Sequence, residues 1–114
     1  MRRSLLESER VMPIRLIWRE EAESHLQAIF DYISSENPRA AKAYLEDIIG
    51  ACDRLRSFPA SGRKYDSRYR VLVVRNHLVV SQQDADAASV SIVAIIDGRR
   101  DVMAILNDLP GPKD

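Results

Sequence analysis

Cysteine is nearly absent from this chain of 114 residues, because Cys52 is the only one. A single cysteine excludes an intramolecular disulfide framework and a zinc site built from cysteines, and it is typical of a reducing compartment. Long apolar runs are also missing, since none approaches the roughly 20 residues that a membrane-spanning helix needs. Residues 1–11 carry five charges and lack the apolar region of a secretory signal. We therefore expect a cytoplasmic protein without a place in a membrane.

Histidine and glycine are scarce, which removes several kinds of catalytic site. The two histidines, His25 and His77, do not have metal-ligand spacing. The four glycines form no phosphate-binding loop, and no serine stands in the setting of a hydrolase nucleophile. Cys52 falls on the apolar stripe of a predicted helix, where a small buried side chain is more common than a reactive thiolate. The sequence predicts no metal, no cofactor and no catalytic residue.

The length and the composition, with 46% hydrophobic and 30% charged residues, are typical of one globular domain. We assign residues 1–11 to a flexible leader, 12–109 to the domain and 110–114 to a polar tail. Whether Met1 or Met12 is the native start stays open. Hydrophobic periodicity places strands at 14–19, 69–74, 77–82 and 89–96, and helices at 20–35, 37–58 and 102–106. This order predicts an α+β fold of the type β-α-α-β-β-β, with a helical hairpin on a mainly antiparallel twisted sheet and a short C-terminal helix.

Local signals set several of these boundaries. Asn37 before Pro38 is typical of an N-cap followed by proline in the first helical turn. That helix is expected to run, with its apolar stripe, through Phe58 to a stop at Pro59. Gly50 lies inside it and indicates either the close approach of a neighbouring backbone or simple tolerance, of which we favour tolerance. Residues 89–96 form a strand that is apolar on both faces, so we expect it inside the sheet with cover on each side.

Charge is balanced over the whole chain, at 17 basic and 17 acidic residues, but it is unevenly distributed. Residues 19–53 hold three bases against eight acids, a net charge of minus five. Residues 54–75 hold seven bases against one acid, a net charge of plus six. This asymmetry favours an anionic partner at the second segment, although a solvated face is the more common explanation of a charge run.

Arginine side chains bind phosphates and carboxylates through two parallel hydrogen bonds, which makes the basic segment together with Arg99-Arg100 a candidate binding surface. Cleavage of RNA there would also need a general base and a general acid. The only candidates nearby are His77, Tyr65 and Tyr69, and we expect Tyr69 to be packed in the sheet. Hydrolysis by acid–base catalysis is therefore poorly supported.

Five short motifs follow one another in an order and at a spacing that together are fairly specific. They are Asp31-Tyr32-Ile33, the helix start at 37–41, the segments 55–63 and 70–74, and the segment 92–101 with Gly98-Arg99-Arg100-Asp101. Over about residues 14–102 the chain resembles the RelE/ParE superfamily of toxins from type II toxin-antitoxin systems, and the ParE branch best. The resemblance implies a bacterial toxin, held in a hetero-oligomer and neutralised by a cognate antitoxin. ParE-like toxins act on DNA gyrase by binding, whereas RelE-like members cut messenger RNA on the ribosome.

The sequence departs from the superfamily pattern at several positions. Val80, Ser81 and Gln82 stand where many relatives have Phe-Tyr-Arg, and Asp97 stands where they often have histidine. No tyrosine or histidine follows Asp101. These departures weaken the nuclease interpretation, and they leave open an inactive relative that only binds its antitoxin.

Contact candidates follow from the basic residues and from the resemblance. For the target we select Arg63, Lys64, Arg68, Arg70, Arg99 and Arg100. For the antitoxin we select Arg54, Arg56, Arg75, Val80 and Gln82. We expect no sequence-specific nucleic-acid binding. The antitoxin is expected to cover the second face of the sheet, so the free toxin would expose apolar surface; the alternative is that the final helix covers that face itself.

Overall fold

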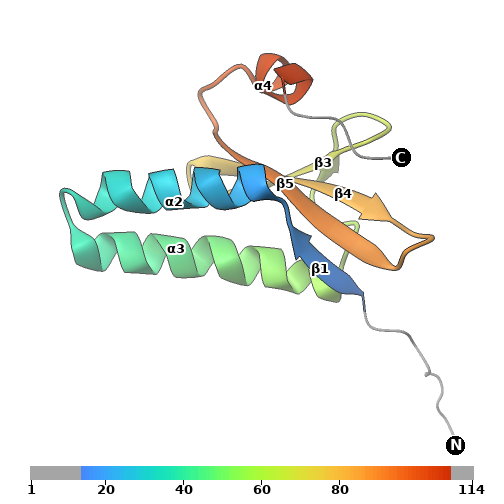
Figure 1. Ribbon diagram of the computed structural model, residues 1–114, viewed down its shortest axis with the longest axis horizontal. Coiled ribbons are helices and arrows are strands. Elements are labelled where there is room, and N and C mark those ends of the chain that lie inside the picture. Colours follow the sequence, from blue (N-terminus) through green and yellow to red (C-terminus); the bar gives the residue numbers. More distant parts are fainter. Residues whose placement is uncertain (1–13, 109–114) are drawn as a thin grey trace, which may run out of the picture.

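The computed structural model describes residues 14–108, and the predicted leader, start codon and polar tail lie outside the described residues. The elements are β1 (Arg15–Trp18), α2 (Glu20–Ser34), α3 (Pro38–Asp53), the 3₁₀ turn η1 (Arg54–Arg56), β2 (Arg63–Lys64), β3 (Arg70–Val74), β4 (His77–Asp84), β5 (Ser89–Asp97) and α4 (Val102–Asp108). The α2–α3 hairpin lies along one side of the twisted sheet (Figure 1). The predicted α+β fold class is confirmed.

The helical hairpin forms where the sequence predicts it, with one difference at the end of α3. The Asn37 side chain accepts a hydrogen bond from the Ala40 N–H at 3.1 Å, and Pro38 occupies the first helical turn. The α-helix ends at Asp53, earlier than predicted, and tightens into η1. Leu55 lies inside η1 and is 1% exposed, whereas Phe58 comes after η1 has ended, outside the helical segment, and is 65% exposed. The prediction of Phe58 on the inward stripe is wrong.

The five-stranded sheet has the order β1-β5-β4-β3-β2, and only the β1–β5 pair is parallel. β5 lies inside the sheet, between β1 and β4, as its two apolar faces predict. The predicted turn at Arg75-Asn76 joins β3 to β4, with Arg75 at a φ of 55°. The short edge strand β2 has no counterpart among the predicted strands.

A β-bulge in β5 changes which face of the sheet the side chains of this strand point to. The register shifts where Val80 pairs with Ala94 and Ser81 pairs with Ile92, so Val93 is the extra residue. A bulge places two consecutive residues on one face. Val93 and Ala94 therefore both belong to the core under α4, whereas Ile92 belongs to the core under the helical hairpin.

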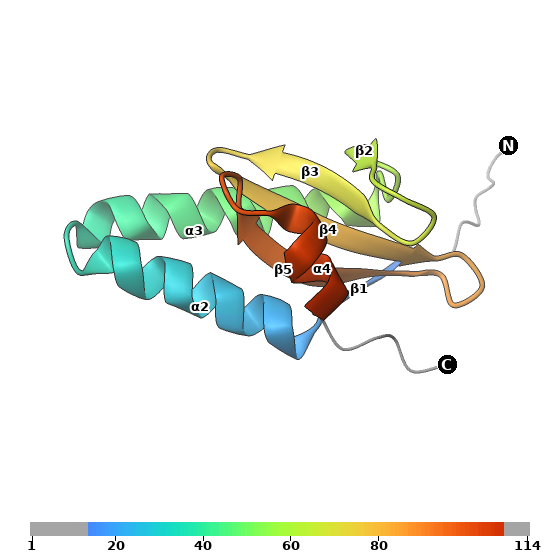
Figure 2. The same ribbon diagram turned by 90° about the horizontal axis from the view of Figure 1, so that it is seen from above.

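The second face of the sheet is covered in part by α4. We expected the free toxin to leave this face uncovered for the antitoxin, and the structure instead has the alternative, in which the final helix covers it. Leu106 of α4 is 2% exposed and packs with Val80, Val93 and Ala94. Figure 2 shows α4 in front of the strands, with α3 behind them and α2 beside them. Val73, beyond this cover, is 64% exposed. The second face is thus closed at its centre and open towards the β3–β4 turn.

Among the described residues, no backbone atom of another element lies close to Gly50. This agrees with the favoured interpretation, in which the helix simply tolerates a glycine at this position. Of the atoms in the described part of the chain outside the helix backbone, a Cβ atom placed there would meet only the Arg54 Nη1 atom, at 3.9 Å.

Candidate functional site

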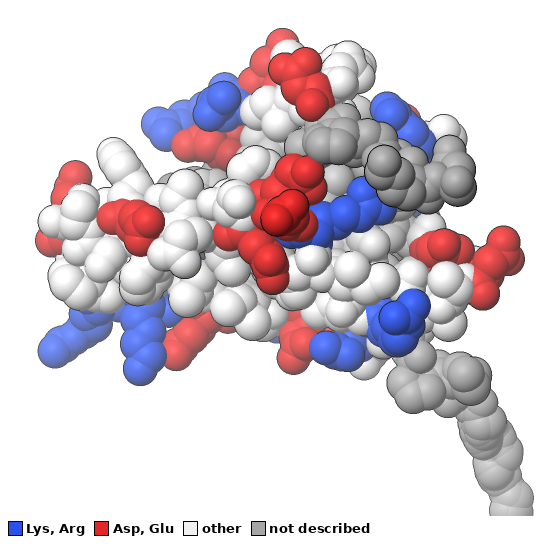
Figure 3. Space-filling view, viewed as in Figure 1, with Lys and Arg blue, Asp and Glu red and all other residues white. Residues whose placement is uncertain are grey.

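The predicted target contacts fall into two groups at opposite ends of β3. Arg63, Lys64, Arg68 and Arg70 lie where β3 begins, and we name these four residues the basic edge. Arg99 and Arg100 lie beside the β3–β4 turn, because the Gly98 N–H donates to the Asn76 carbonyl at 2.9 Å. The two ends of β3, Arg70 and Val74, are four residue steps of about 3.3 Å apart, so the strand separates the two groups by about 13 Å. On the face shown in Figure 3 the basic side chains also occur in separate groups.

The basic edge depends on Gly62, which lets β2 lie against β3. Gly62 has a φ of +87°, and a Cβ atom there would lie 2.6 Å from the Val71 carbonyl oxygen. This close approach needs glycine. It aligns the two residues of β2 with β3, so that Lys64 is directly opposite Arg70. Like charges in opposite positions of a β-ladder are unfavourable, yet no salt bridge within 14–108 involves either residue.

The loop before β3 is built on Asp66. Its carboxylate accepts hydrogen bonds from the backbone N–H groups of Arg68 and Tyr69, at 2.7 and 2.9 Å. The Arg68 guanidinium donates to the same carboxylate at 2.9 Å and lies 4.8 Å from the centre of the Tyr69 ring. The backbone N–H of Arg68 is the main cause that lowers the pKa of Asp66. A hollow of about 290 Å³ lies between this loop and the strands, with Lys64, Arg70, Ser67 and Gln83 in its lining.

The same arrangement recurs after β5. Asp97 accepts from the Arg99 backbone N–H at 2.9 Å and from the Arg99 guanidinium at 2.8 and 3.0 Å. The Arg99 side chain holds the pKa of Asp97 well below its ordinary value. Both loops therefore carry an aspartate two residues before an arginine. This Asp-X-Arg spacing was readable from the sequence, and it predicts that Arg68 and Arg99 are paired and not free cations.

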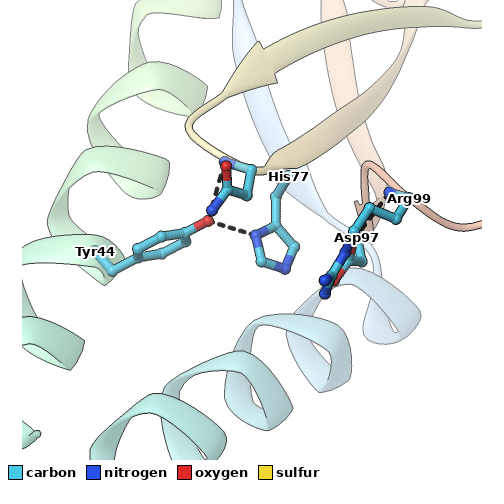
Figure 4. Close-up of polar contacts among 5 residues, drawn as sticks. Tyr44, His77, Asp97 and Arg99 are labelled. Carbon is cyan, nitrogen blue, oxygen red and sulfur yellow. Dashed lines mark hydrogen bonds and ion pairs between the residues drawn. The ribbon is translucent and has the colours of Figure 1, made fainter.

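A groove of about 930 Å³ lies between α2 and the β3–β4 turn, with Tyr32, Val73, His77 and Arg99 in its lining. Tyr44 of α3 points from one side to His77 on β4, and Asp97 and Arg99 lie on the other side of the imidazole (Figure 4). The Tyr44 hydroxyl accepts from the Asn76 N–H at 3.2 Å, which leaves its proton for the His77 Nδ1 atom at 2.6 Å. Burial lowers the pKa of His77, against the opposing charge of Asp97. The imidazole is thus held neutral.

The comparisons with known proteins agree with this architecture. The family described as "ParE toxin of type II toxin-antitoxin system, parDE" matches residues 16–102. The chain belongs to this family of ParE toxins. Among solved structures, the "Chromosomal ParDE TA system from P. aeruginosa" superimposes with a TM-score of 0.65 at 20% identity, over 74% of this chain and 95% of that chain. No curated protein matches. The family is the toxin half of parDE systems, which implies an antitoxin partner.

The predicted antitoxin contacts of this ParE toxin are dispersed. Arg56 is paired with Asp53 at 3.0 Å, and Arg75 is paired with Asp47 at 2.6 Å. Arg54 is exposed in η1. The Gln82 side chain accepts a hydrogen bond from the Arg19 guanidinium at 2.8 Å. Val80 is fully buried. Direct contact with Val80 is therefore not possible while α4 stays in place, and the prediction for that residue needs this correction.

The remaining reactive side chains of the ParE chain have structural partners. Cys52 is fully buried, and burial raises the pKa of its thiol to about 12, which makes it a core residue as predicted. The His25 Nδ1 atom accepts from the Ile95 N–H at 3.2 Å. Within residues 14–108 no three side chains of the metal-binding types gather in one place, and no helix there is long and apolar enough to cross a membrane.

Proposed function

We propose that this ParE toxin inhibits DNA gyrase by binding, in the cytoplasm, and that a cognate antitoxin neutralises it. The match to the ParE family over residues 16–102 carries this proposal. The basic edge supports it, because four bases face only Asp66 in that part of the chain. A surface of one charge sign attracts partners of the opposite sign and speeds their association, and the basic edge is such a surface.

We propose a mode of action without catalysis, and the positions of the titratable side chains favour it. A nuclease would need a general acid and a general base beside the arginines. Tyr69, the phenol nearest to Arg70 in the sequence, is 4% exposed. His77 lies at the other end of β3 and is bonded to Tyr44. The third candidate, Tyr65, lies beside Lys64 and is 37% exposed, and its hydroxyl donates to the Met103 sulfur at 3.6 Å. Tyr69 is thus packed, and His77 and Tyr65 are hydrogen-bonded to other side chains.

For the antitoxin we propose contacts along the open part of the second face and around the helical hairpin. Tyr32 is 73% exposed and Val73 is 64% exposed, and both line the groove beside the β3–β4 turn. An antitoxin segment that folds on binding can cover such apolar side chains. Arg54, Arg56, Arg75 and Gln82 remain candidate contacts at its margins.

Induced expression in bacterial cells that carry a reporter plasmid tests the proposal. The expected result is arrested growth with a relaxed plasmid and unchanged messenger RNA, and normal growth when the neighbouring antitoxin gene is co-expressed. New cleavage sites in transcripts by primer extension, with normal supercoiling, would indicate a RelE-like nuclease. Unaffected growth would indicate an inactive relative that only binds its antitoxin.

A further inference from the structure

Lys64 and Arg70 are like charges on neighbouring strands, and no salt bridge among the described residues involves either of them. The two side chains occupy directly opposite positions of the β2–β3 ladder. Their nearest acid in the same hollow, Asp66, is taken up by Arg68 and by two backbone N–H groups. Among residues 14–108, the Arg70 side chain makes one long hydrogen bond, 3.5 Å from Nη1 to the Gly62 carbonyl. Several of its donors are left for an external anion.

Protection of the sheet edge against aggregation accounts for only part of this arrangement. A lysine on an edge strand prevents pairing with the edge of another sheet. It does not account for Arg70, which lies on the inner partner strand, or for the hollow of about 290 Å³ in which both side chains take part. Ser67 and Gln83 add polar groups to the same lining. The hollow therefore combines two uncompensated cations with neutral hydrogen-bonding groups, which is the composition of a phosphate site.

We propose that this hollow binds a backbone phosphate of duplex DNA, with Lys64 and Arg70 as the two principal contacts. The choice of DNA rests on the proposed function, because gyrase works on duplex DNA. The structure favours a duplex over a single strand. Recognition of single strands relies on bases stacked on exposed aromatic rings. Tyr69, the aromatic residue in the lining, is 4% exposed and has the Arg68 guanidinium over its ring. Tyr65, next to Lys64 in the sequence, is 37% exposed but does not line the hollow, and its hydroxyl donates to the Met103 sulfur of α4 at 3.6 Å.

Phosphate contacts fix position but read no bases. The site therefore gives binding without sequence preference, in agreement with the expectation of no sequence-specific recognition. The affinity of each phosphate contact depends on salt, because bound counterions are released, and the slope of log K against log salt is about −0.9 per contact for B-DNA. Two contacts predict a contribution of about −1.8 to that slope.

Fluorescence anisotropy with the full chain and a labelled 20-base-pair duplex of arbitrary sequence, from 50 to 200 mM salt, measures this contribution. The variant Lys64→Gln with Arg70→Gln should bind about tenfold more weakly at 50 mM salt, with a slope less steep by about 1.8. The matched control, Arg39→Gln with Lys42→Gln on exposed positions of α3, should leave both values unchanged. The charge-preserving pair Lys64→Arg with Arg70→Lys should also keep the slope, which separates charge from folding.

Equal loss in the test variant and in the α3 control overturns the site, because it indicates general attraction to a cationic surface. Tighter binding of single-stranded RNA than of the duplex overturns the assignment to duplex DNA. A variant that binds the duplex normally and loses binding to gyrase without DNA overturns it as well, and identifies a protein contact. Since the anisotropy assay contains no gyrase, failure of this proposal leaves gyrase inhibition to be judged by its own assay.

Discussion

The hydroxyl of Tyr44 and the Nδ1 atom of His77 lie 2.6 Å apart, and this hydrogen bond joins the helical hairpin to the β3–β4 hairpin. The same hydroxyl accepts from the Asn76 N–H at 3.2 Å. Tyr44→Phe removes both bonds and keeps the ring. We expect the free energy of unfolding, measured by urea denaturation, to fall by about 1–2 kcal/mol.

The matched control is Tyr32→Phe, which changes a tyrosine that is 73% exposed. We expect a change within about 0.5 kcal/mol for this surface position. Equal effects of the two substitutions would show that the Tyr44–His77 bond does not hold the hairpins together.

Stability should fall when the pH drops below the ordinary histidine pKa of 6.5. Burial is the main cause that lowers the pKa of His77 and of His25 in the folded chain. Between the lowered and the ordinary pKa the unfolded chain binds more protons, so acid favours unfolding and the full stability is present above pH 6.5. Urea midpoints measured from pH 7.5 to 5.0 give the pH dependence of stability. The variant His77→Gln should show a smaller loss of stability over this range. An NMR titration that gives His77 a pKa above 6.5 would contradict this.

Two glycines should respond to alanine with opposite signs. Gly62→Ala places a methyl group 2.6 Å from the Val71 carbonyl at a φ of +87°, and it should cost about 1–3 kcal/mol. Gly50→Ala, where the new methyl group would make only an ordinary contact with the Arg54 side chain, should stabilise the chain by about 0.5–1 kcal/mol. Thermal unfolding of both variants checks the pair, and stabilisation by Gly62→Ala would contradict the close contact between β2 and β3.

The cover over the second face should depend on Leu106. Leu106→Ala removes a side chain that is 2% exposed against Val80 and Ala94, and it should cost about 2 kcal/mol or more. Met103→Ala, at a position 56% exposed on the same helix, is the control with little effect. Increased binding of a hydrophobic dye to the Leu106 variant alone would show that the face becomes open. Equal dye binding by both variants would mean that α4 does not cover it.

Much of the fold was predictable because its signals are local. The N-cap at Asn37, the unbroken apolar segment of β5 and the turn at Arg75-Asn76 depend on a few consecutive residues, and all three are confirmed. The end of α3 and the edge strand β2 depend on tertiary packing of Leu55 and on the contact at Gly62. Two-residue strands carry no periodicity from which a prediction could be made.

The candidate site was harder to predict, because the net charge of a sequence segment does not show which of its side chains are paired with acids in the folded chain. Residues 54–75 appear strongly basic, but Arg56 and Arg75 pair with acids that precede this segment. Arg68 and Arg99 bind the aspartates two positions before them. Among the described residues of this segment, Arg54, Arg63, Lys64 and Arg70 form no salt bridge, and the β2–β3 register places Lys64 directly opposite Arg70.

Gyrase activity on relaxed plasmid, with the purified ParE chain alone and after incubation with its cognate antitoxin, tests the central claim most directly. Our account predicts that the free chain stops supercoiling, that the antitoxin restores it, and that the RNA in a parallel ribosome assay stays intact. Normal supercoiling at a large excess of a folded chain would contradict it.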